Sequence, residues 1–264
     1  LDVYRTSNGS DGEANTSDDV YWGVDADKGY VSTFTLGMTT DTADAEGKTL
    51  AVVDASGVTE NDINDALAVF RGELDQVPPM YSAIKQNGQP LYKLARQGLE
   101  VERKARRVVI KTLELRAFHP GEQAEIDVSI ECTKGTYVRT LAEDIGKALG
   151  CGAYVSALRR TRSGPFTLAD SVATTTLEAL KDNEQVAEMD KLLLPADAAL
   201  GTLPLVTLSE SAGFYLQQGQ PVLVPNAPCS GMVRVALPDG EFLGVAEILD
   251  DGRVAPRRLV VTNR

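Results

Sequence analysis

The sequence has little of the side-chain chemistry that metal sites, disulfide frameworks and membrane spans require. Its single histidine, His119, has no second histidine with which to ligate a metal or relay a proton, so we assign it no role. The three cysteines, Cys132, Cys151 and Cys229, include no Cys-x-x-Cys pair, which favours buried free thiols. No apolar run approaches the roughly 20 residues of a membrane span, and the N-terminus lacks a signal pattern. We therefore expect a soluble, cytoplasmic protein with no metal and no membrane partner.

The chain also lacks the positive net charge that is typical of proteins that bind nucleic acid. Its formal net charge is -12, whereas Lys and Arg supply most of the affinity for phosphate. The distribution is uneven, because residues 1–77 carry 16 acidic and 4 basic side chains while residues 78–116 carry 9 basic and 3 acidic ones. The segment 78–116 is either an electrostatic footprint for nucleic acid or, as is more common for one charge run, a solvated face.

The residues that are present suffice for one large domain and a small one. The chain has 264 residues, of which 43% are hydrophobic, enough for a substantial core. Residues 1–24 are polar and show no sustained period, which is typical of loop or poorly ordered chain. Prolines and small residues at 195–204 predict a linker, so we expect domains at 1–198 and 203–264.

Hydrophobic periodicity predicts helices and strands in both domains. Thr59 and Asp62 have capping-box spacing at one helix start, and Gly150 is placed to end another helix. The expected strands are 30–36, 49–53, 108–118, 124–132 and 153–162, and, in a small antiparallel barrel or sheet, 232–237, 242–249 and 254–261. The expected helices are about 60–71, 140–149, 176–192 and 209–218.

Two short segments in the acidic part of the chain resemble ligand-binding motifs but lack residues that those motifs require. Gly47-Lys48-Thr49 follows Thr42 where a phosphate-binding P-loop needs a glycine. The acidic run Asp41–Glu46 lacks the alternating ligands of a calcium loop. Neither motif therefore predicts a ligand.

Two longer segments are far more specific. Residues 70–98, FRGELDQVPPMYSAIKQNGQPLYKLARQG, and residues 132–166, CTKGTYVRTLAEDIGKALGCGAYVSALRRTRSGPF, closely resemble the bacterial tRNA pseudouridine synthase B family. The resemblance runs from about Asp25 to the end of the chain and includes DADKGY at 25–30. The C-terminal GEFLGVAEILDDGRVAPRRLVV is similar to the PUA-type RNA-binding domain of that family. Several motifs in one order make the resemblance strong.

The resemblance implies a fold and an activity. The implied fold is α+β, with a catalytic domain on a mixed, mainly antiparallel sheet followed by a small PUA-like β-barrel. The implied reaction isomerises the T-loop uridine of tRNA (position 55) to pseudouridine, without metal, nucleotide or organic cofactor. The implied partner is the T-arm stem-loop of tRNA, and we expect a monomer.

The resemblance also assigns roles to pocket residues. A flipped base must be held while it turns, and aromatic stacking of about 1–3 kcal/mol per base tolerates rotation. Tyr30, in DKGY, is the candidate stacking surface, although its position alone would suggest a core aromatic. Arg139, in KGTYVR, resembles the arginine that pairs with the catalytic carboxylate and keeps it ionised, with a surface arginine as the alternative. Tyr137 resembles a substrate-pocket residue, and Leu158 resembles the apolar wall against the base, where core packing is the alternative.

The nucleophile segment departs from the family. The family's Gly-x-Leu-Asp-Pro-x-Ala-Thr-Gly motif is not intact here, and only Leu1-Asp2 and Thr6 match it. Asp2 lies 28 residues before Tyr30, about the separation of nucleophile and stacking tyrosine in the family. Asp2 is therefore the candidate nucleophile, and an exposed terminal aspartate is the alternative.

Basic residues around these motifs are the candidate phosphate contacts, with solvated charge as the alternative for each. They are Lys85, Lys93, Arg96, Arg159, Arg160 and Arg162, together with Arg103, Arg106 and Arg107.

A non-enzymatic interpretation also remains open. Without an intact nucleophile segment, the chain would be a tRNA-binding or folding module that keeps the RNA groove and lacks the chemistry. An ionised carboxylate beside Arg139 and Tyr30 would favour the enzyme.

Overall fold

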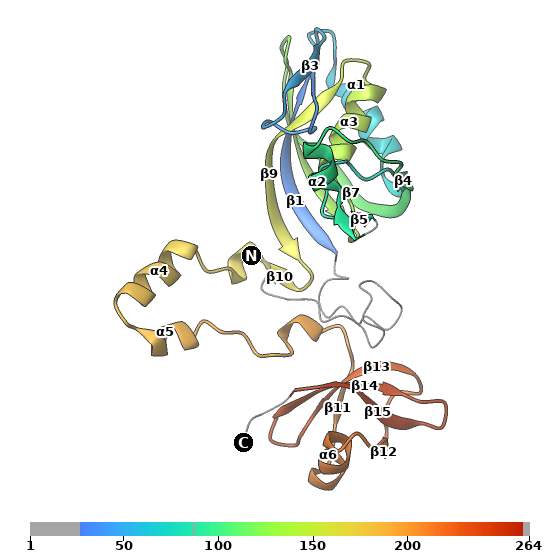
Figure 1. Cartoon of the computed structure of the whole chain (residues 1–264), viewed down its shortest axis with the longest axis vertical. Coiled ribbons are helices and arrows are strands. Elements are labelled where there is room, and N and C mark those ends of the chain that lie inside the picture. Colours follow the sequence, from blue (N-terminus) through green and yellow to red (C-terminus); the bar gives the residue numbers. More distant parts are fainter. Residues whose placement is uncertain (1–26, 87, 261–264) are drawn as a thin grey trace. The chain divides into compact units, whose positions relative to one another are not determined.

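The computed structural model of the chain describes residues 27–86 and 88–260. They form two compact units that divide between residues 169 and 170 (Figure 1). The candidate nucleophile Asp2 lies outside the described residues. None of the described helices is long and apolar enough to cross a membrane.

A six-stranded sheet forms the body of the first unit. Its strand order is β10-β9-β1-β8-β7-β4, and every neighbouring pair is antiparallel. The long strands β1 and β9 run side by side in Figure 1. The strands are β1 (Lys28–Leu36), β4 (Gly72–Gln76), β7 (Arg106–His119), β8 (Glu125–Cys132), β9 (Ala153–Ser163) and β10 (Phe166–Thr167). The predicted α+β class with a mainly antiparallel sheet is confirmed, whereas the edge strand β4 was not predicted.

Alternation of buried and less buried residues, strict in β8, buries one face of this sheet. In β8, Ile126, Val128 and Ile130 are buried at every second position, since successive side chains of a strand point to opposite faces. Helices α1 (Glu60–Val69) and α3 (Val138–Ala148) pack on this face and complete a single core cluster. The predicted capping box of Thr59 and Asp62 at the start of α1 is present.

Helix α3 lies unusually close to β9. A Cβ on Gly146 would lie 2.2 Å from the Ala153 nitrogen, so only glycine allows this approach. Gly150 follows α3 in a left-handed conformation, at φ +77°, and ends the helix as predicted. The close packing holds the C-terminal end of α3 against the sheet.

Two small insertions project from the sheet of the first unit. One is the hairpin of β2 (Met38–Thr40) and β3 (Thr49–Val52), which confirms the strand predicted at 49–53. The other contains the short strands β5 (Lys85–Gln86) and β6 (Gln89–Pro90) and the helix α2 (Leu91–Arg96).

The second unit contains a five-stranded sheet of order β11-β13-β14-β15-β12 with its own core cluster. The three strands predicted here are confirmed, and so is a helix that ends before Gly219. The antiparallel pairing predicted for these three strands is confirmed, whereas β11, which was not predicted, pairs with β13 in parallel. The elements are β11 (Leu205–Thr207), α6 (Glu210–Gln217), β12 (Val222–Leu223), β13 (Gly231–Ala236), β14 (Phe242–Ile248) and β15 (Arg253–Leu259).

The segment before this sheet is helical but broken. The helical stretch predicted at about 176–192 is divided into two separate helices, α4 (Thr174–Asp182) and α5 (Val186–Asp190). The side chain of Asn183 donates to the carbonyl of Ala179, and Glu184 adopts a left-handed conformation at φ 56°. Neither helix has a buried residue, so no packed apolar stripe keeps the helix continuous. Two 3-10 turns, Leu168–Asp170 and Ala198–Leu200, flank the segment.

The cysteine prediction is correct for two of the three thiols. Cys132 and Cys151 are buried and free. Cys229 is exposed, because it lies in the loop between β12 and β13, beside Pro228, and not in the core.

Candidate functional site

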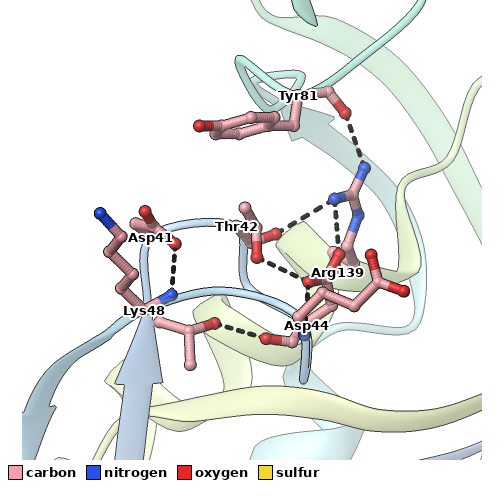
Figure 2. Close-up of polar contacts among 8 residues, drawn as sticks. Asp41, Thr42, Asp44, Lys48, Tyr81 and Arg139 are labelled. Atoms are coloured by element: carbon pink, nitrogen blue, oxygen red, sulfur yellow. Dashed lines mark hydrogen bonds and ion pairs between the residues drawn. The ribbon is translucent and has the colours of Figure 1, made fainter. Parts of the chain in front are cut away.

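Three hydrogen bonds hold the guanidinium of Arg139. Its Nη1 donates to Asp44 Oδ2 at 2.8 Å and to the Thr42 carbonyl at 3.2 Å, and its Nη2 donates to the Tyr81 carbonyl at 2.7 Å (Figure 2). Arg139 and Asp44 are both largely but not fully buried, with side chains 23% and 28% exposed. A fixed fork of charge-assisted hydrogen bonds in such a setting keeps both the arginine and the carboxylate in one orientation.

The loop 41–48 is shaped by its own side chains. Thr40 Oγ1 donates to the Asp44 carbonyl, Thr42 Oγ1 donates to Asp44 Oδ1, and the backbone N–H of Lys48 donates to Asp41 Oδ1. Ala43 adopts a left-handed conformation at φ 58°, and Asp44 forms a parallel bridge with Val155 of β9. Asp44 therefore reaches Arg139 from a loop that is anchored to the sheet.

The segment 76–82 approaches the start of α3 from the other side. Gln76, at the end of β4, exchanges two hydrogen bonds with the backbone of Tyr137. Tyr81 supplies the carbonyl that binds Arg139. Arg103 donates to the carbonyl of Pro78 at 3.2 Å, so this candidate phosphate contact supports the segment instead.

Tyr30 is a buried aromatic on β1 with one cationic neighbour. Only 8% of the residue is exposed, and it belongs to the core cluster. The guanidinium carbon of Arg160 lies 5.6 Å from the centre of its ring, within the range of a cation–π interaction. Burial raises the pKa of Tyr30, against the opposing effect of Arg160, so the phenol stays neutral at physiological pH. Arg160 is therefore engaged with Tyr30 in this structure.

Leu158 and Arg160 accompany Tyr30 on one face of the sheet. Tyr30 pairs with Arg160, and Ser32 pairs with Leu158, so the two β9 side chains are two residues apart and point to the same face. Leu158 is 49% exposed. The core-packing alternative for Leu158 is wrong, since Leu158 is exposed to solvent on the face that also carries Tyr30.

The carboxylate beside Arg139 is not beside Tyr30. Asp44 is joined to Val155, which pairs with Phe34, and Phe34 lies four residues from Tyr30 along β1. At about 3.3 Å per residue, that separation is about 13 Å. The enzyme interpretation asks for a carboxylate beside both Arg139 and Tyr30. Asp44 lies beside Arg139 only. Among the described residues, Arg139 Nε and one hydrogen of Nη2 have no acceptor, which leaves it able to bind a further carboxylate.

The candidate phosphate contacts are partly gathered. Lys85, Arg103, Lys104 and Arg106 line a cavity of about 300 Å³ whose apolar wall includes Leu91. Lys93 and Arg96 lie exposed on α2, where Arg96 stacks on Tyr92. Other candidates are engaged in ion pairs: Arg107 with Glu73 and Asp75, and Arg162 with Glu131 at 3.4 Å. Arg159 is exposed on β9.

Three residues of the site were not predicted from the sequence, namely Asp44, Gln76 and Tyr81. The acidic run Asp41–Glu46 was the signal that could have identified Asp44, but it was interpreted only as a failed calcium loop.

Among the described residues, no three His, Cys, Asp or Glu side chains come together as a metal site. Burial raises the pKa of the Cys132 thiol near Tyr30, which keeps it protonated and a poor nucleophile.

Family comparisons cover nearly the whole chain. Residues 20–138 match the model of the TruB family pseudouridylate synthase N-terminal domain. Residues 139–201 match the tRNA pseudouridylate synthase B C-terminal domain, and residues 204–260 match a pseudouridine synthase II TruB C-terminal model. Asp2 precedes the first matched residue.

Curated relatives and solved structures agree with these matches. The chain is 52% identical over 237 residues to tRNA pseudouridine synthase B of Pseudomonas fluorescens (strain Pf0-1), covering 90% of this chain and 76% of that protein. It is 49% identical over 241 residues to the protein of that name from Saccharophagus degradans, at 90% and 77% coverage. Among solved structures, a Cbf5-Nop10-Gar1 complex matches with a TM-score of 0.59 and 25% identity, over 86% of this chain and 61% of that one. An archaeal box H/ACA sRNP Nop10-Cbf5 complex matches in fold with a TM-score of 0.60 and 20% identity, over 90% and 67%.

Proposed function

We propose that this chain, which belongs to the TruB family of pseudouridylate synthases, isomerises the T-loop uridine of tRNA to pseudouridine. In this reaction the bond between N1 and the ribose breaks, the uracil turns, and carbon 5 bonds to the ribose. The hydrogen on carbon 5 leaves as a proton, and N1 takes up a proton, so the reaction has no net gain or loss of atoms.

The orientation of Arg139 carries this proposal. The three contacts of its guanidinium leave N–H groups for a second carboxylate. We propose that this carboxylate is Asp2 and that Arg139 keeps it ionised, since an adjacent cation favours the charged form of an acid. Asp44 then acts as a positioning residue that holds Arg139.

The flipped uracil has a candidate binding surface on β1 and β9. We propose that it stacks on Tyr30 and contacts Leu158, the exposed apolar side chain on the same face. Tyr137, at the start of α3, would line the pocket beside Arg139. The RNA backbone would lie along Lys85, Lys93, Arg96 and Arg159, because these basic side chains are exposed to solvent and can reach phosphate oxygens.

We further propose that the linker 195–204 separates a catalytic domain from a PUA-like RNA-binding domain. The family models support this division, because they meet between residues 201 and 204. T-arm specificity, a monomeric state and a cytoplasmic location are part of the same proposal.

Release of tritium tests the activity directly. With a T-arm stem-loop RNA that carries uridine tritiated at carbon 5, the chain in excess is expected to release tritium in a single turnover. The non-enzymatic alternative, a tRNA-binding or folding module, predicts that the RNA binds and no tritium is released. A T-arm RNA with cytidine at the target position is the matched control for binding.

Replacing Tyr30 by Leu is expected to lower the rate of pseudouridine formation about 5- to 150-fold, because base stacking worth about 1–3 kcal/mol is lost. Tyr30→Phe keeps the ring and should stay close to the unmodified protein. The measurement is the single-turnover rate of both variants, with thermal unfolding as a check on the core. Equal losses in Leu and Phe would contradict stacking and assign the effect to the hydroxyl.

A further inference from the structure

The side chain of Gln76 holds the backbone of Tyr137 through two hydrogen bonds. Gln76 is the last residue of the edge strand β4 and is only 5% exposed. Its Oε1 accepts from the N–H of Tyr137 at 2.7 Å, and its Nε2 donates to the carbonyl of Tyr137 at 3.1 Å. One buried amide therefore satisfies both backbone groups of a single residue.

Tyr137 is the point at which α3 begins. It is the N-cap residue, and it provides no side-chain cap for the helix. Its N–H precedes the helical ladder and needs a partner from elsewhere, because an unpaired buried N–H is costly. Its carbonyl accepts from the N–H of Leu141 at 3.1 Å. Gln76 thus satisfies the N–H of the N-cap residue, as the N3 side chain does in a capping box, and fixes where the first turn of α3, which carries Arg139, starts.

The chain that follows Gln76 makes a second contact with the same turn. Five residues later, the Tyr81 carbonyl accepts from Arg139 Nη2 at 2.7 Å. Pro78 and Pro79 lie between these two contacts and restrict the backbone, and Arg103 binds the carbonyl of Pro78. Gln76 and Tyr81 therefore hold the backbone and the side chain of one helical turn from a single stiff segment.

We propose that Gln76 is a positioning residue for Arg139. The inference rests on the proposed function, in which Arg139 orients the catalytic carboxylate. The chemistry of the site requires a glutamine: a carboxylate at this position would accept from Tyr137 N–H but could not donate to its carbonyl, and an aliphatic side chain would do neither. An asparagine carries the same amide on a stem that is one methylene shorter, so it would not reach the backbone of Tyr137 without movement of β4.

A double-mutant cycle tests the link between Gln76 and Arg139. Gln76→Leu is expected to lower the single-turnover rate at saturating RNA about 10- to 100-fold, since a misplacement of about 1 Å can cost about 100-fold. The dissociation constant for the RNA should stay unchanged. If Gln76 acts through Arg139, Gln76→Leu should change the rate little once Arg139 is already replaced by Lys. The expected change in that background is no more than about 2-fold, which is the scatter within which independent mutations add. A full 10- to 100-fold loss in that background would overturn the proposal.

Amide hydrogen exchange gives a readout that does not depend on activity. In Gln76→Leu, the Tyr137 amide and the first turn of α3 should exchange faster, while the end of α3 near Ala148 should be unchanged. Ile63→Val, a buried change in α1, is the control for general loss of stability and should leave the Tyr137 amide protected. If the unmodified chain forms no pseudouridine, the proposed function fails, and unchanged exchange at Tyr137 would independently overturn the positioning role.

Discussion

Replacing Asp2 by Asn should reduce tritium release by about 1,000-fold or more, because the amide cannot act as the nucleophile. Spacing supports the assignment of Asp2, since Asp2 precedes Tyr30 by 28 residues in a chain that otherwise matches its family. Arg139 adds physical support, because its guanidinium keeps N–H groups for a carboxylate besides Asp44. The measurement is the single-turnover rate of tritium release from the T-arm RNA, with binding of the same RNA measured in parallel.

The controls for Asp2 separate chemistry from charge. Asp65→Asn removes one carboxylate from the exposed face of α1 and should leave the rate unchanged. RNA binding should be the same for both variants, because a nucleophile acts after binding. If Asp2→Asn releases tritium at the rate of the unmodified chain, Asp2 is not the nucleophile. If the unmodified chain binds RNA but releases none, the binding module is the better account of this chain.

Arg139→Lys should lower the rate about 100- to 1,000-fold, the cost of removing one preorganised electrostatic group from an active site. Lysine keeps the charge but is a compact ammonium, so it cannot reach Asp44, the Thr42 carbonyl and the Tyr81 carbonyl together. The loss should appear in the rate at saturating RNA and not in the dissociation constant. The measurement is again single-turnover tritium release at several RNA concentrations.

A matched surface arginine controls for the loss of a guanidinium. Arg116 is exposed on β7, and Arg116→Lys should have no effect on the rate. A weaker RNA affinity with an unchanged saturating rate in Arg139→Lys would place Arg139 among the phosphate contacts and remove it from the catalytic pocket.

Local periodicity in the sequence was enough to predict the central elements of the first unit. Alternating β-branched and apolar residues predicted β1, β7, β8 and β9, because one face of each strand is buried against helices. The Thr59–Asp62 box and Gly150 predicted helix ends, since capping and left-handed turns depend on neighbouring residues alone. The family motifs KGTYVR and DKGY likewise predicted Arg139 and Tyr30 as site candidates from the sequence alone.

Local signals were weaker where no packing supports them. The break between α4 and α5 was missed although residues 181–185 between them are all polar, and neither helix buries a residue. The parallel pairing of β11 with β13 was also missed, since a three-residue strand carries no periodicity and its direction depends on the path of the connecting chain.

The surroundings of Arg139 depend on tertiary packing and could not be predicted from the sequence. Asp44 lies 95 residues away from it along the chain, and its role depends on a loop whose backbone is bridged to β9. The partner of Tyr137 is Gln76, 61 residues away, on an edge strand that the sequence did not predict. Hydrogen bonds between such distant residues leave no periodic trace, because they depend on how the sheet, α3 and two loops pack together. The motifs therefore predicted Arg139 and Tyr30 as site candidates, and the packing determined what holds Arg139 in place.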